Sequence, residues 1–279
     1  MYLLTGITGH VGGAAARALL NAGKKVRALV RDVDTAQKLF PEVEMVKGDL
    51  TDRGALERAL AGVDGVFILV PPQNREPDPI GTSRRMIETY APLVARAKNI
   101  VVLSSHGADQ DGGTGFIYVA YLLEQALKGA PATMIRAGSF FENYEHAVAT
   151  AKATGTYNTF LGPLDRKFPF IASEDIGKQV AHWLQQPPAQ RIIELGTMTS
   201  PNDVAAALTK AVGRDVTAQW VTREHWDGAL AAMHMPPHAR ALFVEMQDAI
   251  QSGRISFERP DAIRVDGTLA LEQFFQRLA

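Results

Sequence analysis

The chain has 279 residues, of which 46% are hydrophobic and 21% are charged, and this balance predicts a folded protein with a large core. Its 29 basic and 30 acidic residues give a formal charge of −1, which leaves no long-range field to attract nucleic acid or an anionic membrane. The absence of cysteine excludes disulfides, thiolate metal ligands and a thiol nucleophile. No apolar run approaches the roughly twenty residues of a membrane span and no leader pattern is present, so we expect a cytoplasmic protein.

Short apolar segments alternate with helical patterns through the first half of the chain. The segments expected as strands are Tyr2–Leu4, Val26–Val30, Val43–Val46, Gly65–Val70, Ile100–Leu103 and Thr133–Arg136. The segments expected as helices are Val11–Ala22, Gly54–Leu60, Thr82–Ala97 and Val119–Lys128. This alternation predicts an α/β fold, a Rossmann-type doubly wound parallel sheet with helices on both faces.

The pattern becomes irregular after about Ser139, and we expect residues 139–188 to be rich in loops. A strand is expected at Ile192–Leu195, followed by helices around Pro201–Val212, Arg223–Met233, Pro237–Ser252 and Thr268–Leu278. The sequence therefore predicts a dinucleotide-binding domain over 1–138 and a smaller, mostly helical substrate-binding portion over 139–279. Part of that portion, about 170–195, is expected to return to the Rossmann sheet. Open α/β sheets bind ligands at the carboxyl ends of their strands, where the second portion should lie.

A glycine-rich turn follows the first expected strand, Gly6-Ile7-Thr8-Gly9-His10-Val11-Gly12, and an alanine-rich helix comes directly after it. Gly6 permits the tight turn, Gly9 lets the main chain approach a pyrophosphate, and Gly12 lets helix and strand pack closely. The amide groups at the helix start favour phosphate. A glycine-rich turn without a ligand is the alternative, but strand, turn and helix together favour a dinucleotide site that also includes Thr8, His10 and Val11.

The end of the second expected strand bears on the choice of cofactor. Arg31 stands where an arginine can pair with the 2′-phosphate of NADP, and Asp32 follows it. We therefore favour NADP(H) over NAD(H). In the alternative, Arg31 is a solvated loop residue and Asp32 binds the ribose hydroxyls.

These residues resemble the NmrA-like group of atypical short-chain dehydrogenase/reductases, a family that includes NADPH-dependent quinone reductases and nucleotide-sensing regulators. Lys47–Asp52 is similar to the family's adenine loop, which implies contacts from Asp49 and Leu50. Phe67–Pro72 is similar to the strand and loop under the nicotinamide ribose, which implies Leu69, Val70 and Pro71.

The resemblance continues toward the expected nicotinamide side. Val101–Ser105 resembles the fifth strand of the family, which implies contacts from Ser104 and Ser105. Met134–Asn143 resembles its Leu-Arg-Pro-Gly-x-Phe-x-x-Asn segment, with Ala137 in place of the usual proline. The residues implied to contact the cofactor there are Ala137, Gly138, Ser139 and Phe140.

Many short-chain dehydrogenases use a Tyr-x-x-x-Lys pair, which is absent after the fifth expected strand. Tyr118 is followed four residues later by Leu122, and Tyr121 stands at the lysine position if the chain is aligned on Glu124. An unassisted tyrosine titrates near 10 and is a poor base at neutral pH, so alcohol oxidation and ketone reduction are disfavoured. Tyr118 and Tyr121 are our candidates for orienting hydroxyls in the catalytic site, and packing of this helix face is the alternative.

A quinone, an azo group or an iminium ion disperses the arriving charge by itself, so positioning can carry most of the catalysis. We expect an NAD(P)H-dependent reductase of a small conjugated electrophile. A redox sensor that binds NADP without turnover is the main alternative, and a sugar-nucleotide epimerase is weakened by the missing pair. No histidine spacing suggests a metal site, catalysis by His106 is not favoured, and a homo-oligomer is compatible with this interpretation.

Overall fold

The computed structural model describes residues 1–255, 257 and 259–279, and within them the main sheet has eight strands. Its order is β13-β10-β6-β5-β4-β1-β2-β3, and every pairing is parallel. The strands are β1 (Tyr2–Thr5), β2 (Val26–Val30), β3 (Glu44–Lys47), β4 (Gly65–Ile68), β5 (Ile100–Ser105), β6 (Ala132–Ala137), β10 (Arg191–Leu195) and β13 (Ile263–Val265). The chain reverses its direction of winding between β1 and β4, the topological switch point where such sheets bind ligands.

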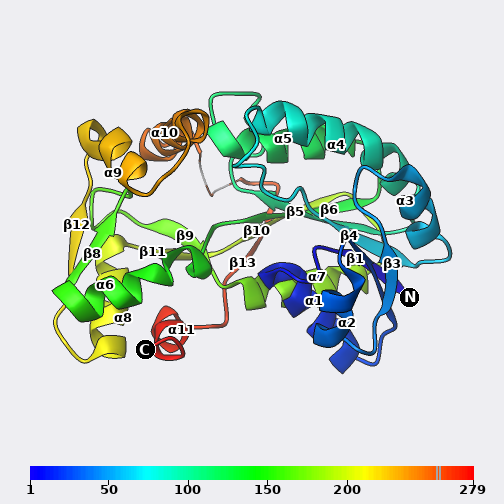
Figure 1. Ribbon diagram of the computed structural model, residues 1–279, viewed down its shortest axis with the longest axis horizontal. Helices are drawn as coiled ribbons and strands as arrows, with labels where there is room; N and C mark the ends of the chain where they lie inside the picture. The colour runs from blue at the N-terminus through cyan, green and yellow to red at the C-terminus, as the bar shows by residue number, and fades with distance from the viewer. Residues whose placement is uncertain (256, 258) are drawn as a thin grey trace.

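Helices cover both faces of this sheet (Figure 1). One layer holds α1 (His10–Asn21), α2 (Val33–Leu39) and α7 (Ser173–Leu184), and the other holds α3 (Arg53–Leu60), α4 (Pro79–Val94) and α5 (Tyr118–Ala126). Successive strand side chains alternate between the two layers: Leu4 packs under the first layer and Leu3 under the second. The strands are therefore apolar on both faces, as expected for a buried parallel sheet.

The predicted Rossmann-type fold is confirmed, with shifts at element ends, but helix α2 and the edge strand β13 were missed. The fourth helix begins at Pro79, three residues before the predicted start, because the Asp78 carboxylate caps it by accepting from the Gly81 amide. Helix α2 was not predicted. It has only seven residues and buries only Ala36, too little to produce a helical pattern.

The C-terminal portion has two small sheets as well as helices. A three-stranded sheet has the order β11-β9-β7, and a two-stranded one pairs β12 with β8. These strands are β7 (Ser139–Phe140), β8 (Thr156–Thr159), β9 (Phe168–Ile171), β11 (Thr197–Thr199) and β12 (Thr217–Trp220). The helices are α6 (His146–Thr154), α8 (Pro201–Val212), α9 (Trp226–Ala232), α10 (Pro237–Gln251) and α11 (Leu271–Gln276), with 3₁₀ turns η1 (Gly115–Ile117), η2 (Phe141–Tyr144) and η3 (Arg223–His225).

The prediction that residues 139–188 are rich in loops was wrong, because they contain β7, α6, β8, β9 and α7. Their strands have two to four residues, and their partners lie far away in the sequence, as for β8 and β12. Such strands are too short to show an alternating pattern.

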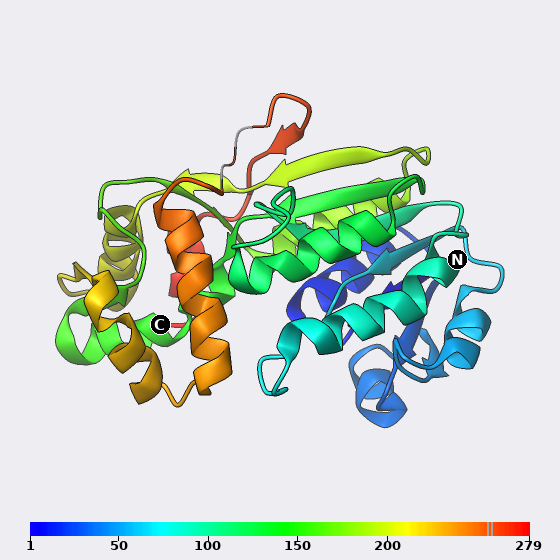
Figure 2. The same ribbon diagram turned by 90° about the horizontal axis from the view of Figure 1, so that it is seen from above.

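The chain passes twice from the main sheet into the small three-stranded sheet. Strand β6 continues through Gly138 into β7, and β10 continues through Gly196 into β11. The C-terminal portion thereby lies at the carboxyl ends of the main strands (Figure 1), and in the view of Figure 2 helix α10 crosses in front of it. The division into domains at 138/139 stays a prediction. Helix α7 and strand β10 follow this boundary in the sequence, but both pack on the main sheet.

Candidate functional site

The glycine turn joins β1 to α1 and presents main-chain amides to the carboxyl end of the sheet. Gly6 has a φ of 64°, and the Gly9 amide donates to the Gly6 carbonyl oxygen over 2.9 Å. Gly9 is the N-cap of α1, and no side chain caps this helix. Its first turn holds no acid either. The unclaimed amides and the helix dipole make this turn suited to a phosphate group.

Close contact within the turn requires glycine at position 12. A Cβ atom on Gly12 would lie 2.2 Å from the Gly6 carbonyl oxygen and 2.6 Å from the Gly6 carbonyl carbon. Thr8 and His10 are exposed beside the turn, whereas the Val11 side chain is buried in the core. Val11 can therefore face a ligand only through its main chain.

A second glycine, which the sequence did not point out, holds the same helix from its other side. Gly177 of α7 packs on α1 so closely that a Cβ atom there would lie 2.4 Å from the Ala14 Cβ and 2.6 Å from the Ala15 amide nitrogen. Helix α1 is thus fixed against both the turn and α7. The one available signal was a glycine in the middle of an otherwise regular helical pattern.

The residues predicted near the ribose and adenine lie at the ends of β2 and β3. Arg31 is exposed, and its charge contributes to lowering the pKa of Asp49, after the larger effect of the Thr51 hydroxyl and amide. The Asp49 carboxylate accepts from that hydroxyl at 2.6 Å and that amide at 2.7 Å, so it is turned into its own loop. The Leu50 side chain is buried in the core.

Asp32, the alternative ribose ligand, has both carboxylate oxygens engaged. One accepts from the Thr35 amide at 3.0 Å and the other from the Thr35 hydroxyl at 2.6 Å, which caps α2. These bonds lower the pKa of Asp32. The helix cap therefore competes with any ribose hydroxyl for this carboxylate.

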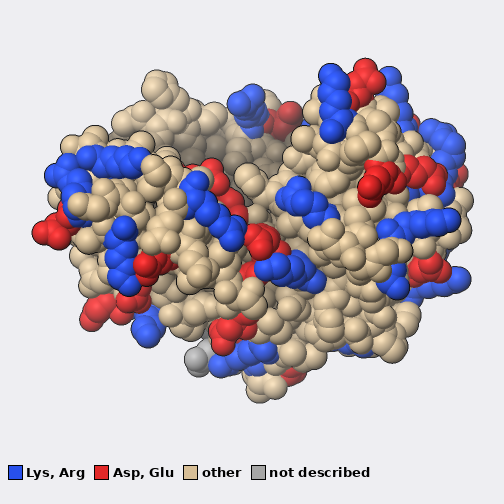
Figure 3. Space-filling model, turned by 90° about the horizontal axis from the view of Figure 1, so that it is seen from below, with Lys and Arg blue, Asp and Glu red and all other residues tan. Residues whose placement is uncertain are grey.

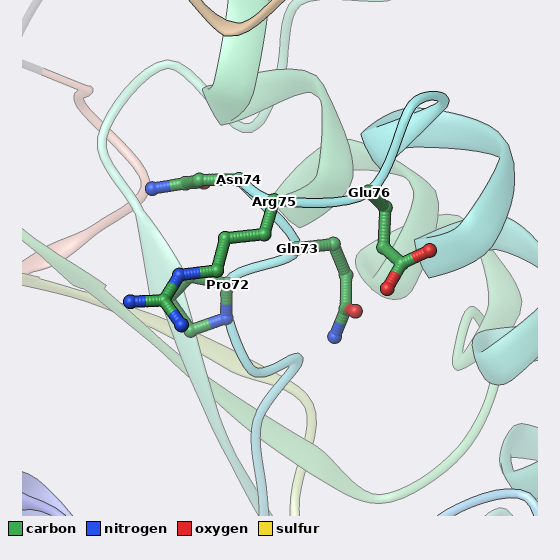
Figure 4. Close-up of a pocket in the computed structure, with 5 residues that line it drawn as sticks. All are labelled: Pro72, Gln73, Asn74, Arg75 and Glu76. Atoms are coloured by element: carbon green, nitrogen blue, oxygen red, sulfur yellow. The ribbon is translucent and has the colours of Figure 1, made fainter. Parts of the chain in front are cut away.

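The segment after β4 lies beside the glycine turn. A Cβ atom on Gly6 would lie 3.1 Å from Leu69 Cδ2, so the Leu69 side chain covers that glycine. Val70 and Pro71 are partly buried and follow it. The loop then forms a hollow of about 280 Å³ lined by residues 72–76, where Asn74 and Arg75 extend to one side and Gln73 and Glu76 to the other (Figure 4).

Ser104 and Ser105 end β5, opposite Arg136 and Ala137 of β6. The Ser104 hydroxyl donates to Glu124 Oε1 at 2.5 Å. Arg136 Nε and Nη2 hold the same carboxylate at 2.9 and 2.6 Å, and all three side chains are buried. Ser104 thus belongs to a buried polar network between the sheet and α5. Ser105 lies on the opposite face of the strand, is partly exposed, and donates only to the His106 carbonyl at 3.1 Å.

The β6–β7 segment brings the other predicted nicotinamide residues together. The Ala137 carbonyl accepts from the His106 amide at 3.3 Å, and the Gly138 amide donates to the Leu195 carbonyl at 2.9 Å. Phe140 is partly buried. The Ser139 hydroxyl lies 3.0 Å from the hydroxyl of Tyr144, whose pKa burial raises to about 12.

Tyr118 and Tyr121 lie at the start of α5. Their rings stack with centroids 5.6 Å apart and planes within 14°, and both are partly exposed. They share one helix face, as their spacing indicates. Leu122 stands four residues after Tyr118, and Glu124 stands three residues after Tyr121. Neither of these two positions supplies a basic side chain that could assist a tyrosine hydroxyl.

Two carboxylates, for which the sequence analysis gave no role, attach the C-terminal portion to α7. The Glu142 side chain caps α7 by accepting from the Ser173 amide at 3.0 Å and from its hydroxyl. Asp175 accepts from the amides of Thr268 and Leu269 at 2.7 and 2.8 Å. Burial alone would raise the pKa of Asp175, but these bonds lower it.

Surface charge, metal-ligand geometry and helix length bear on other classes of site. Basic and acidic side chains are interspersed on the face shown in Figure 3. Over the described ranges, no group of three His, Asp or Glu side chains is placed to hold a metal ion. No described helix is long and apolar enough to cross a membrane.

A sequence model of the NmrA-like family matches residues 2–99 and 121–258. The chain belongs to this family. A relative, the NAD(P)H azoreductase of Xenophilus azovorans, is 29% identical over 85% of this chain and 82% of its own length. Quinone oxidoreductase 2 of Escherichia coli is 26% identical over 85% of this chain and 83% of its own length.

Solved structures of similar shape include the triphenylmethane reductase of Citrobacter sp. complexed with NADP(H), with a TM-score of 0.81, 20% identity and full coverage of both chains. Another is an NADPH-dependent quinone oxidoreductase from Escherichia coli, with a TM-score of 0.79 and 22% identity over 100% of this chain and 99% of its own. At these identities the likeness concerns the fold. The predicted NmrA-like resemblance is confirmed.

Proposed function

We propose that the chain is an NAD(P)H-dependent reductase that transfers hydride to a small conjugated electrophile such as a quinone or an azo compound. The observation that carries this proposal is the uncapped start of α1 under the Gly6–Gly12 contact, a ready phosphate cradle at the switch point of the sheet. The azoreductase and quinone oxidoreductase relatives support an NAD(P)H-dependent oxidoreductase.

The surroundings of α5 favour an acceptor that needs no protein base. No lysine follows Tyr118 at the fourth position, and Glu124 is committed to Arg136 and Ser104. The bound cofactor supplies the hydride, and the residues around it hold the acceptor in place and exclude water. Tyr118 and Tyr121 are proposed to orient the acceptor through their hydroxyls. Ser105 is proposed to bind the carboxamide group of the nicotinamide. Ser104 is less suited to this role, because its hydroxyl proton is already donated to Glu124.

The preference for NADP(H) over NAD(H) is also a proposal. Arg31 is exposed at the end of β2, where its guanidinium can pair with a 2′-phosphate. Asp32, the alternative ligand for the ribose hydroxyls, already uses both carboxylate oxygens to cap α2. Both observations point to the phosphorylated cofactor.

The other residues predicted to contact the cofactor also remain predictions. They are Gly6, Thr8, Gly9, His10, Val11, Gly12, Asp49, Leu50, Leu69, Val70, Pro71, Ala137, Gly138, Ser139 and Phe140. Residence in the cytoplasm and assembly into a homo-oligomer also stay predictions.

The reductase activity is tested by mixing the protein with NADPH and a panel of quinones and azo dyes and following the loss of NADPH absorbance. We expect turnover with at least one class of acceptor. Tight cofactor binding with no turnover across the panel would contradict the proposal and favour the redox-sensor alternative.

The cofactor preference is tested with Arg31→Ala and, as a matched control, Arg84→Ala on the exposed face of α4. Loss of one charge-assisted contact should raise the KM for NADPH about tenfold, the equivalent of about 1.4 kcal/mol, and leave the KM for NADH nearly unchanged. The Arg84 variant should change neither value. Equal KM changes for the two cofactors in the Arg31 variant would refute the assignment.

A further inference from the structure

A second pocket lies beside the end of β5, at a distance in sequence from the glycine turn. It has a volume of about 200 Å³, and its walls come from the residue after β5, from β9 and β11, and from the end of α10. We call it the basic pocket and define it by His106, Arg166, Lys167, Phe168, Met198 and Ile255. Its volume is below the range for drug-sized ligands, so its occupant must be small.

The charges of this pocket have one sign. Arg166 and Lys167 are basic, and none of the described residues that line it is acidic. Neither of these two residues takes part in an ion pair within the described part of the chain. The Lys167 charge contributes to lowering the pKa of Asp203, after the larger effect of the Ser200 amide and hydroxyl, so Asp203 lies within range of its field. Since the whole chain has a charge of −1, two cations and no acid among the described lining residues are a local exception.

Arg166 is held in a fixed position. Its Nη1 donates to the Gln251 carbonyl at 2.6 Å and its Nη2 to the Ile250 carbonyl at 3.2 Å, at the end of α10. Its guanidinium also lies 5.1 Å from the centre of the Phe168 ring. These partners are neutral, so they fix the side chain and leave its charge available to a ligand. Lys167 is exposed and can move toward an anion at the pocket mouth.

His106, the residue after β5, also lines the pocket and supplies a polar ring. Its Nδ1 lies 3.1 Å from the Ala137 carbonyl, which can only accept, so this nitrogen carries the proton and donates. The other ring nitrogen, Nε2, then carries a lone pair and can accept a hydrogen bond from a donor group on a ligand. Burial lowers the pKa of His106, which favours the neutral ring.

Between these polar groups the walls are apolar. Phe168 is buried, Met198 is 43% exposed, and Ile255 packs against Gly107. An exposed methionine beside an aromatic ring suits a flat hydrophobic surface, because its side chain adapts to the shape it meets. The pocket therefore combines apolar walls with two basic side chains.

We propose that the basic pocket binds a small, flat organic anion such as an aromatic carboxylate or sulfonate. Such a ligand lies against Phe168 and Met198 and directs its anionic group to Arg166 and Lys167. The anion is either the charged end of the electron acceptor or a separate ligand. Only the first of these two roles rests on the reductase function proposed above, and binding itself does not.

Binding is tested on the full chain by calorimetry with naphthalene-2-sulfonate and its neutral analogue, naphthalene-2-sulfonamide. We expect the sulfonate to bind at least about fivefold more tightly, the scale of one charge pair at a hydrated surface. Lys167→Gln should weaken the sulfonate about fivefold and leave the sulfonamide unchanged, whereas Met198→Gln should weaken both. Lys128→Gln, an exposed lysine at the end of α5, is the matched control and should change neither.

A competition assay with NADPH and a quinone then distinguishes the two sources of the anion. Competition between the sulfonate and the quinone assigns the pocket to the acceptor, and binding without competition assigns it to a separate ligand. Equal affinity for the two naphthalenes, or an unchanged sulfonate affinity in Lys167→Gln, overturns the proposal. Because the binding arm needs no turnover, it can succeed in a chain that reduces no quinone, so the two proposals fail separately.

Discussion

Replacement of Gly12 by alanine perturbs the glycine turn at its tightest point. The new Cβ atom would lie 2.2 Å from the carbonyl oxygen of Gly6. Favourable carbon contacts begin at about 3.5 Å, so the turn and the helix must separate by more than about 1 Å. Both contacting groups are main chain, and neither can rotate away as a side chain would.

Overpacking of this kind typically costs about 1–3 kcal/mol. If the strain is relieved by opening the turn, the amides at the start of α1 lose their alignment on the pyrophosphate. The same free energy then appears as NADPH binding about 5- to 150-fold weaker. The midpoint of thermal unfolding should fall as well, because the strain is present without cofactor.

The measurement is calorimetric titration of NADPH into Gly12→Ala, with near-ultraviolet circular dichroism to verify that the variant is folded. Gly13→Ala is the matched control, since its Cβ would lie 3.1 Å from the Ile7 carbonyl oxygen and needs only a small adjustment. Alanine also suits a helix interior better than glycine. The control should bind NADPH within about threefold of the parent chain. An equally small change in Gly12→Ala would refute the close-packing argument.

Three further changes test the supports of the site. Asp175→Ala leaves the amides of Thr268 and Leu269 without their acceptor and should lower the free energy of unfolding in urea by about 3 kcal/mol; a loss below about 0.5 kcal/mol would argue against this anchor. Glu124→Ala leaves the buried Arg136 guanidinium without its carboxylate partner and should lower the free energy of unfolding by about 3 kcal/mol. Ser104→Ala should lower it by about 1 kcal/mol, and equal losses in the two variants would contradict the network. Burial lowers the pKa of His106, so the unfolded chain takes up a proton that the folded chain resists, and stability should fall as pH drops below about 6.5. His106→Gln should lose less stability than the parent between about pH 7 and 5.5, and parallel urea curves would exclude this cause.

The first half of the fold could be predicted from the sequence because its signals are local. Strand β1, the turn and α1 occupy one continuous segment, and each glycine has a reason that can be stated from its neighbours in the chain. Asp52 and Asp78 cap helices through bonds to residues three positions later, a local signal that the predicted starts at Gly54 and Thr82 did not use. Local hydrogen bonds and helical spacing are the kind of information that a single sequence carries.

The contacts that complete the candidate site are not local. Ser104 meets Glu124 and Arg136 across 20 and 32 positions, and only the fold shows that the serine proton is already committed. Strands β8 and β12 pair between segments some sixty positions apart, and each has four residues, too few for an alternating pattern. His106 and Arg166 likewise line one pocket although they are sixty positions apart in the sequence.

The cofactor turn and the C-terminal portion are linked through α7. Gly12 holds the start of α1 against the turn, and Gly177 holds the next residues of α1 against α7. The start of α7 is in turn fixed by Glu142, which follows the nicotinamide-side segment, and by Thr268 through Asp175. Packed interiors transmit displacement because they contain little free volume. A shift of the C-terminal portion would therefore reach the amides at the start of α1, which the proposed function assigns to the cofactor.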